Sequence, residues 1–402
     1  MENLEISEIF KAQEVLKSVA AETPITGPTS LSDKCEVYLK AENLQLTGSF
    51  KLRGAYYKIS QLSDEEKKNG VVACSAGNHA QGVALGATNN GIESLICLPT
   101  LAPLSKVEAT KKLGAKVCMV DGVYDDAYQK ALELKEKEGY TFIHPFDDPL
   151  VIAGQGTIGL EILRQLPEVE AVVVPVGGGG LISGVAFAIK TLRPDVKVYG
   201  VQAEGAPSMK KSLDKGERIS LDKVSTIADG ISVKEPGELT VERCRKYVDE
   251  IVTVNDDEIS AAILSLMEKQ KVVSEGAGAV AVAAVMFDKL PVEGKKVVCL
   301  VSGGNIDVNI LSKVMTRGLV KSGRVVALTL DLPDKPGVLT EISKIISDQG
   351  GNVISVIHER SSTFTNIKGC HLHIEMETRN HEHVAEIKRL LKAAGYPILR
   401  SY

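Results

Sequence analysis

The segment Leu46-Thr-Gly-Ser-Phe-Lys-Leu-Arg-Gly-Ala55 places one lysine, Lys51, between Gly48 and Gly54. Lysine is the side chain that forms a Schiff base with a carbonyl compound, so Lys51 is a candidate to hold a carbonyl cofactor covalently. The two glycines let the backbone approach a flat cofactor closely, and Phe50 offers a ring that can pack beside it. Because most lysines are solvated surface charges, the segment becomes informative only together with the motifs that follow it.

Beyond this segment, short apolar runs alternate with helical patterns along the chain. The runs that we predict to be strands cover residues 71–74, 95–98, 116–120, 171–176, 198–202 and 297–301. Continuous apolar strands between helices are typical of a mostly parallel sheet that is covered on both faces. We therefore predict an α/β fold for residues 1–314.

The first of these strands runs into the segment Cys74-Ser-Ala-Gly-Asn-His-Ala-Gln-Gly82, which opens a predicted helix. Backbone N–H groups at such a junction lack partners, and the helix dipole favours an anion there. Ser75, Asn78 and His79 add polar side chains, so a carboxylate or a phenolate-like oxygen would fit this loop. The pattern is equally typical of a capped turn with Ser75 or Asn78 at the N-cap, and the residues leave both interpretations open.

Four consecutive glycines in the segment Val176-Gly-Gly-Gly-Gly-Leu181 join another predicted strand to a helix. Four glycines allow an unhindered nest of N–H groups, which favours a phosphate site over a simple tight turn. The segment Gly154-Gln-Gly-Thr-Ile-Gly159 matches a dinucleotide-binding pattern, but no strand is predicted before it and no acidic residue follows at the required distance. We interpret its three glycines as sites of close helix packing.

A third junction, Ser302-Gly-Gly-Asn305, ends the strand that we predict over residues 297–301. It places one hydroxyl group, that of Ser302, at the carboxyl end of a strand, where open α/β sheets bind ligands. A simple turn is the alternative interpretation of this segment.

Together, these motifs resemble threonine dehydratases (threonine ammonia-lyases) of the tryptophan-synthase-β-like superfamily of pyridoxal phosphate enzymes. This superfamily has the fold type II architecture and includes serine racemases. The resemblance covers residues 5–315 and rests on G-S-F-K-L-R-G-A, S-A-G-N-H-A-Q-G, the four glycines and S-G-G-N, in the order of the family. It implies pyridoxal 5'-phosphate as the cofactor and a small-molecule amino acid as the substrate.

The resemblance implies a role in cofactor binding for several of these residues. Lys51 would bind the cofactor and later take the proton from the substrate Cα, and Phe50 would pack against the cofactor ring. The phosphate would be held by Gly177, Gly178, Gly179, Gly180 and Leu181. Ser302 would face the pyridine nitrogen, where a neutral hydroxyl makes the cofactor a weaker electron sink and favours prompt loss of a β-hydroxyl.

The resemblance also implies how the loop after residue 74 would act. Asn78 would hydrogen-bond the ring hydroxyl of the cofactor. The substrate carboxylate would be held by Ser75, Asn78 and His79.

The pattern of the chain changes after residue 314. Residues 315–324 contain two glycines and several basic residues and are predicted to be a linker. Residues 325–402 predict the order strand, helix, strand, strand, helix, strand, which is a ferredoxin-like βαββαβ unit. The segment Asp331-Leu-Pro-Asp-Lys-Pro-Gly-Val-Leu339 makes this unit resemble an ACT domain, a regulatory module that binds amino acids. The resemblance implies an effector site at Asp334 and Gly337, a homo-oligomer (dimer or tetramer), and isoleucine as effector if the role is biosynthetic.

The composition is that of an ordinary globular chain of 402 residues, 25% charged and 44% hydrophobic. A net charge of -5, with no Trp and no block of Lys and Arg, argues against a nucleic-acid partner. Seven scattered cysteines without a C-x-x-C pair indicate reduced thiols in a cytoplasmic protein. The N-terminus has no apolar segment of the kind found in a signal peptide.

Two further patterns bear on membranes and metals. The uncharged run 171–189 is interrupted by Pro175 and four glycines, so we predict a strand, a loop and a helix rather than a membrane span. His371 and His373 are explained by the polar face of one strand, so we expect no metal there. A metal ion near Glu204, as in some relatives, stays an open question.

We therefore predict elimination from L-threonine to give 2-oxobutanoate and ammonia, with L-serine as a secondary substrate. A serine or threonine racemase on the same fold is the closest alternative. Such a racemase needs a second proton donor, and this chain has Ala76 where racemases of the superfamily carry a serine. A non-catalytic amino-acid sensor is the other alternative, and the intact Lys51, phosphate loop and Ser302 argue against it.

Overall fold

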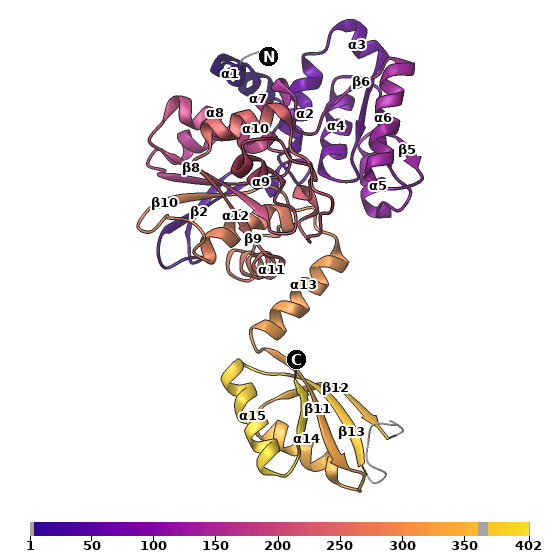
Figure 1. Ribbon diagram of the computed structural model, residues 1–402, viewed down its shortest axis with the longest axis vertical. Helices are drawn as coiled ribbons and strands as arrows, with labels where there is room; N and C mark the ends of the chain where they lie inside the picture. Colours follow the sequence, from indigo (N-terminus) through magenta and orange to yellow (C-terminus); the bar gives the residue numbers. More distant parts are fainter. Residues whose placement is uncertain (1–3, 361–368, 402) are drawn as a thin grey trace. The chain divides into compact units, whose positions relative to one another are not determined.

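The computed structural model describes residues 4–360 and 369–401, and the chain divides into two compact units, Met1–Val308 and Asn309–Tyr402 (Figure 1). The larger unit contains a six-stranded sheet. Its strands are β1 (Ile25–Thr29), β2 (Glu36–Ala41), β7 (Ala171–Pro175), β8 (Lys197–Ala203), β9 (Glu250–Val254) and β10 (Lys296–Val301). They lie in the order β1-β2-β10-β7-β8-β9, with β1 antiparallel to β2 and all other neighbours parallel. The predicted α/β class is confirmed.

A second, four-stranded parallel sheet lies in the same unit. Its strands are β3 (Val71–Cys74), β4 (Ser94–Pro99), β5 (Lys116–Val120) and β6 (Thr141–Phe142). They lie in the order β5-β4-β3-β6. The sequence predicted most of these strands but not their division between two sheets, because apolar periodicity carries no information on which strands pair.

Helices pack on both sheets of the larger unit. They are α1 (Ile6–Leu16), α2 (Lys51–Ser60), α3 (Asp64–Asn69), α4 (Asn78–Asn89), α5 (Leu104–Lys112), α6 (Tyr124–Glu138), α7 (Pro149–Gln165), α8 (Gly180–Leu192), α9 (Ser208–Lys215), α10 (Glu238–Tyr247), α11 (Asp256–Ser265) and α12 (Gly276–Met286). Helix α12 lies in the interior beside β7, β8, β9 and β10, which explains why it carries no charged residue. The uncharged run 171–189 forms β7, a loop and most of α8, as predicted.

The segment 154–159, which matches the dinucleotide-binding pattern, lies inside α7 and serves helix packing. A methyl group on Gly154 would lie 2.6 Å from the carbonyl oxygen of Arg53 in α2. A methyl group on Gly156 would lie 3.0 Å from the carbonyl oxygen of Gly184 in α8. The glycines therefore let α7 approach both neighbouring helices, and the interpretation as close helix packing is confirmed.

The smaller unit contains all but the first residue of α13 (Val308–Lys321) and continues as an antiparallel sheet with two helices. Its elements are β11 (Val325–Pro333), α14 (Val338–Asp348), β12 (Asn352–Glu359), β13 (Gly369–Glu377), α15 (His381–Ala393) and β14 (Ile398–Ser401). The strands lie in the order β12-β13-β11-β14, and this βαββαβ arrangement confirms the predicted topology. The predicted linker 315–324 coincides with the second half of α13 and the turn at Gly323.

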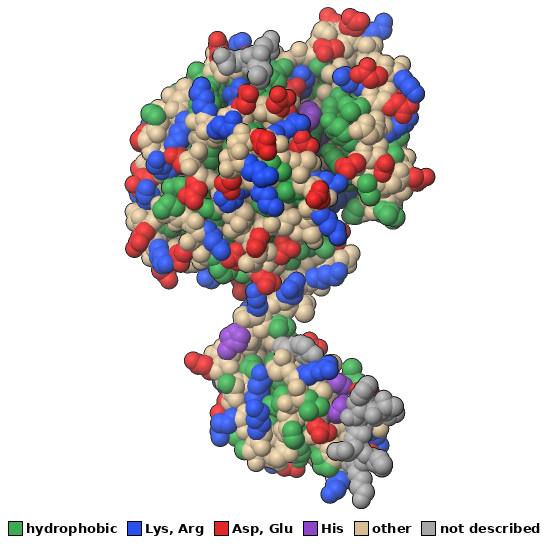
Figure 2. Space-filling model, viewed as in Figure 1, with side chains coloured by type: hydrophobic (Ala, Val, Ile, Leu, Met, Phe, Trp, Pro, Cys, Tyr) green, Lys and Arg blue, Asp and Glu red, His purple; other side chains and the backbone are tan. Residues whose placement is uncertain are grey.

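None of the described helices is both long and apolar enough to cross a membrane. On the face that Figure 2 shows, described basic and acidic side chains are mixed rather than gathered by sign.

A buried group of four charged side chains joins the elements around the start of α2. The Arg53 guanidinium lies 2.8 Å from Glu42 and 2.6 Å from Glu161, and the Lys40 ammonium lies 2.5 Å from Glu161. All four side chains are at most 8% exposed. Two positive and two negative charges balance, which is the condition under which charges can be buried at all. This network fixes α2 against β2 and α7.

We expect Arg53→Met to destabilise the larger unit by about 3–5 kcal/mol, because it leaves two buried carboxylates with one lysine as counter-charge. The measurement is the thermal or urea unfolding transition of the larger unit. Arg193→Met is the matched control, because Arg193 pairs with Asp195 on the surface and such pairs contribute roughly 0–1 kcal/mol. Equal effects of the two substitutions would contradict the role of the network.

Candidate active site

Two segments that lie about 250 residues apart in the chain are hydrogen-bonded to each other, and we call them the paired segments (48–50 and 302–304). The amide of Phe50 donates to the Ser302 carbonyl oxygen at 3.1 Å, and the amide of Gly304 donates to the Gly48 carbonyl oxygen at 2.9 Å. Ser49 and Gly303 form an isolated antiparallel bridge between them. The pairing brings the lysine motif and the Ser302 motif together at the end of β10. The sequence motifs alone did not show that these two segments are neighbours.

Lys51 is the first residue of α2, directly after the paired segment 48–50. Its Nζ donates a hydrogen bond to the Pro145 carbonyl oxygen at 2.9 Å and lies 5.3 Å from the centre of the Phe50 ring. Burial lowers the pKa of Lys51 to about 8, although the nearby Glu275 carboxylate acts in the opposite direction. A lysine with a lowered pKa has a larger neutral fraction near pH 7, which is what a nucleophile or a general base requires.

The four-glycine loop lies between β7 and α8 and contacts the segment that Lys51 touches. A methyl group on Gly178 would overlap the Phe146 ring, and one on Gly180 would lie 2.7 Å from the Phe146 carbonyl oxygen. Gly179 is the N-cap of α8 with a φ of +99°, a left-handed conformation that favours glycine. The loop therefore needs its glycines for backbone approach. The first amides of α8 have no acceptor within the helix, and amides of this kind can bind an anion.

Asn78 begins α4, and its side-chain amide is held from both sides. Its Nδ2 donates to the Glu275 carboxylate at 2.7 Å, and its Oδ1 accepts from Asn305 Nδ2 at 2.8 Å. The N-cap of α4 is Gly77, without a side-chain cap. The capping interpretation with Ser75 or Asn78 is therefore wrong for this loop, because Asn78 already has helical backbone and uses its side chain elsewhere.

The two other predicted residues of this loop have local partners. Ser75 Oγ accepts a hydrogen bond from the Gly77 amide at 3.1 Å, which shapes the turn before α4. His79 is buried, and its Nε2 lies 2.8 Å from the Ile143 carbonyl oxygen, so that Nε2 carries the proton. Burial, together with the charge of Lys51, lowers the pKa of His79 to about 3 and keeps the ring neutral. Their contact with a substrate carboxylate stays a prediction.

Ser302 follows β10 and is buried, with 2% of the residue exposed. The contact from Ser302 Oγ to the Ala277 carbonyl oxygen is long, at 3.5 Å. A hydroxyl group with such a weak partner keeps most of its capacity for a hydrogen bond to a ligand.

Glu275 is a site residue that the sequence analysis missed. Its side chain is buried against Asn78, and a methyl group on Gly303 would overlap its carboxylate. Burial raises the pKa of Glu275 to about 7, with a further contribution from the Asp229 charge. A signal was present, because Glu275 is the one charged residue in the stretch 272–287. An isolated charge in an apolar stretch indicates a buried functional or paired group.

Comparison with known proteins places this geometry in context. A family model described as "Pyridoxal-phosphate dependent enzyme" matches residues 17–303. The chain is 54% identical over 395 residues to the L-threonine ammonia-lyase of Thermotoga maritima, covering 98% of each chain. It is 43% identical over 390 residues to the L-threonine ammonia-lyase of Geobacter sulfurreducens, covering 96% of this chain and 97% of the other.

Two solved structures are similar to about four fifths of this chain. Threonine deaminase isoform 2 of Solanum lycopersicum has a TM-score of 0.74 at 42% identity, covering 79% of this chain and 94% of that structure. Maize serine racemase also has a TM-score of 0.74, at 36% identity, covering 80% of this chain and 99% of that structure. The backbone fold therefore does not separate the two activities.

The raised pKa of Glu275 makes a pH-dependent contribution to stability. Its pKa rises from the usual 4.5 to about 7 on folding, so the folded cofactor-free protein holds this proton more tightly than the unfolded chain. This contribution is fully present below about pH 4.5 and is lost as the pH rises through about 7. Relative to Glu275→Gln, the wild type should lose about 3 kcal/mol of stability between about pH 4 and 8.

The measurement is thermal unfolding of the cofactor-free proteins across this pH range. Glu217→Gln, which changes an exposed carboxylate, is the control and should follow the wild type. Parallel pH profiles of wild type and Glu275→Gln would show that Glu275 is not a buried carboxylic acid.

Proposed function

This chain belongs to the family of pyridoxal-phosphate-dependent enzymes, and from this premise we propose that it is a threonine ammonia-lyase, which converts L-threonine to 2-oxobutanoate and ammonia. Its similarity to two L-threonine ammonia-lyases over nearly the whole chain supports this activity. The structural observation that carries the proposal is the convergence of the Lys51 amine, the Asn78 amide and the Ser302 hydroxyl around the paired segments. L-Serine is the secondary substrate.

The residues fit pyridoxal 5'-phosphate. The loop Gly177–Gly180 and the Leu181 amide form a phosphate site at the start of α8, a helix of 13 residues. The buried Ser302 hydroxyl has the capacity to meet a pyridine nitrogen, and the Asn78 amide can meet a ring hydroxyl. Phe50 is partly buried against the apolar core formed by β7, β8, β10 and α8, and it supplies an apolar surface for the ring.

When bound, pyridoxal phosphate supplies the electron sink that stabilises negative charge on the substrate Cα. Lys51 would hold the cofactor through its amine. In its neutral form, which burial favours, the Lys51 amine would also accept the substrate Cα proton. Ser75, Asn78 and His79 orient the substrate carboxylate at the start of α4, where the helix dipole also favours an anion.

Glu275 positions Asn78 in this mechanism. The hydrogen bond from Asn78 Nδ2 to Glu275 and the one from Asn305 Nδ2 fix the amide plane in one orientation. A fixed amide adds no reorganisation cost at the moment of reaction. Asn305, the last residue of the S-G-G-N motif, thereby has a function that the motif did not reveal.

The chemistry at the face opposite Lys51 separates elimination from racemisation. Racemisation requires a second group that returns a proton to Cα, and the residue after Ser75 is Ala76, whose methyl group carries no exchangeable proton. Elimination requires no such group, because the β-hydroxyl leaves instead. The chain therefore favours the lyase over the racemase.

We expect Lys51→Ala to lose at least about 10³-fold of the lyase rate, because both the covalent anchor and the base are removed. The assay follows 2-oxobutanoate from L-threonine, with chiral analysis of the remaining amino acid. Lys58→Ala, in the same helix but paired with Asp148 instead, is the matched control and should retain activity. Substantial turnover by Lys51→Ala would refute the assignment, and faster formation of D-amino acid than of 2-oxo acid would favour the racemase.

For the smaller unit, we propose an ACT domain over residues 325–402 that binds an amino-acid effector, with residues 1–314 as the catalytic domain and 315–324 as the linker. The βαββαβ order supports this, and the turn before α14 is shaped for a carboxylate, since Gly337 is its N-cap with a φ of +92°. Asp334 is exposed and forms an ion pair with Arg360 at 3.2 Å. We further propose a homo-oligomer in the cytoplasm, where the seven free thiols remain reduced.

We expect isoleucine to inhibit threonine turnover by the full-length protein, with a coupling of about 5- to 150-fold between the two ligands. Asp334→Ala should weaken this inhibition, because the carboxylate attracts the effector ammonium group. Asp348→Ala, an exposed carboxylate at the other end of α14, should leave the inhibition unchanged. If isoleucine neither binds to the wild type nor inhibits it, this unit does not have the proposed regulatory role.

A further inference from the structure

Three potential metal ligands of different chemistry meet at one edge of the smaller unit. They are the carboxylate of Asp334, the imidazole of His358 and the thiol of Cys370, and their ligand atoms all lie within 4.8 Å of one another. The His358 Nε2 and the Cys370 Sγ are 3.0 Å apart. In the part of the chain that the structure describes, this is the one group of three such residues close enough to share an ion.

The strand register explains why these residues meet although they are far apart in sequence. Cys370 of β13 pairs with Leu332 of β11, two residues before Asp334, and His358 of β12 pairs with Leu372 of β13. Cys370 and Leu372 are two residues apart and therefore lie on the same face of the sheet, as does His358 through its pairing. The turn after β11 then brings Asp334 to this face.

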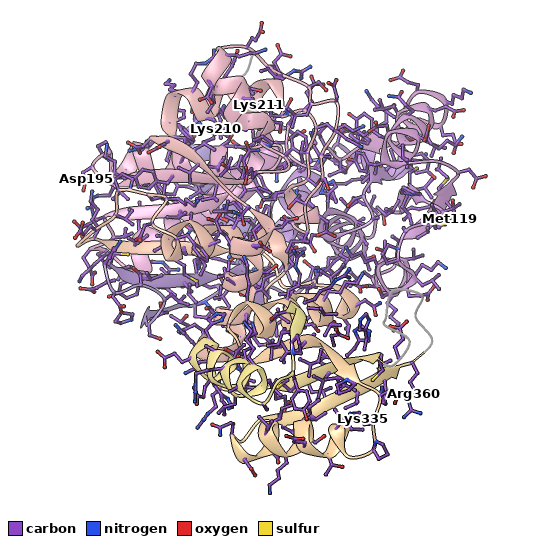
Figure 3. The ribbon with its side chains drawn as sticks, turned by 60° about the horizontal axis from the view of Figure 1, so that its bottom comes forward. Met119, Asp195, Lys210, Lys211, Lys335 and Arg360 are labelled. Carbon is purple, nitrogen blue, oxygen red and sulfur yellow. The ribbon has the colours of Figure 1, made fainter. Side chains whose placement is uncertain are left out.

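A cavity of about 170 Å³ lies beside two of the three ligands, His358 and Cys370. It is lined by His358, Cys370, Arg360 and Lys335, together with the turn before α14. Figure 3 labels Lys335 and Arg360, which lie at the same edge of this unit. The cavity gives room for an ion and for a water molecule or a small ligand in a fourth coordination position.

We propose that Asp334, His358 and Cys370 bind a divalent cation of the zinc class, with one coordination position open to the cavity. Thiolate and imidazole ligands select zinc-like ions, whereas magnesium and calcium prefer sites made of oxygen alone. Zinc lies roughly 2.0–2.3 Å from such ligands, which separates tetrahedral ligand atoms by about 3.3–3.8 Å. The observed separations are 3.0 Å between His358 and Cys370 and at most 4.8 Å for the other pairs, within about 1 Å of this range.

The ion pair between Asp334 and Arg360 does not prevent metal binding. Both side chains are substantially exposed, at 36% and 65%, and solvent screening makes an exposed ion pair of this kind weak. Asp334 therefore exchanges Arg360 for the ion at little cost.

This inference goes beyond the proposed lyase activity and does not depend on it. It also differs from the sequence expectation, in which His371 and His373 were considered for metal binding and no metal was expected. His373 is instead engaged with Thr329 and Glu359, and its neighbour His371 pairs in register with Asp331 and Glu359. The amino-acid effector site proposed above shares Asp334, so a bound ion would lie beside the effector.

The test uses the full-length protein with its cofactor, dialysed against Zn²⁺ and then against buffer. We expect one zinc ion per chain, with an X-ray absorption spectrum that contains one sulfur neighbour at about 2.3 Å and lighter neighbours at about 2.0 Å. Cys370→Ser should remove the sulfur neighbour. His358→Gln and Asp334→Asn, which change exposed side chains, should weaken zinc binding about 10-fold or more.

Cys118→Ser, which changes a partly buried thiol in the larger unit, is the matched control and should retain both zinc and the sulfur neighbour. Circular dichroism identifies any variant that fails to fold. If Cys370→Ser fails to fold, the variants at the exposed positions 334 and 358 still decide the test. Retention of less than a stoichiometric amount of zinc by the wild type, a site without sulfur, or unchanged binding in His358→Gln and Asp334→Asn would each overturn the proposal. Because zinc content and coordination are read directly, these results do not depend on lyase activity.

Discussion

The backbone pairing between residues 48–50 and 302–304 is the constraint on which the catalytic geometry depends. It fixes the start of α2, and therefore Lys51, against the end of β10, and therefore Ser302. The amide of Glu275 also donates to the Gly303 carbonyl oxygen at 3.1 Å, so a third segment is attached to the same site. Backbone hydrogen bonds of this kind position side chains more rigidly than contacts between flexible side chains would.

Burial then determines the chemistry of the groups that this pairing brings together. Burial lowers the pKa of Lys51 to about 8, and burial raises the pKa of Glu275 to about 7. Both shifts favour the neutral form, which for lysine is the reactive amine. The buried network of Arg53, Glu42, Glu161 and Lys40 contrasts with this pair, because its members are fully paired and serve to fix α2 rather than to react.

In the smaller unit, strand pairing also brings together side chains that are distant in the sequence. Its βαββαβ order places a turn, the edge strand β12 and the neighbouring strand β13 together at one edge of the sheet. Ligand-type side chains from all three meet beside a cavity. A regulatory turn and a zinc-class site at the same edge would allow an ion to change how strongly an amino acid binds, since both draw on the Asp334 carboxylate.

The sequence alone predicted the α/β class and the βαββαβ unit and proposed the site residues Lys51, Asn78 and Ser302, because apolar periodicity and glycine-rich junctions are local properties of the chain. It did not reveal the division of the strands into two sheets, the Gly77 N-cap, or the role of Glu275. It also did not reveal that His358 and Cys370 lie 3.0 Å apart. Each of these depends on which distant segments become neighbours and how deeply they are buried. Strand pairing and desolvation decide both, and they exist only in the folded chain.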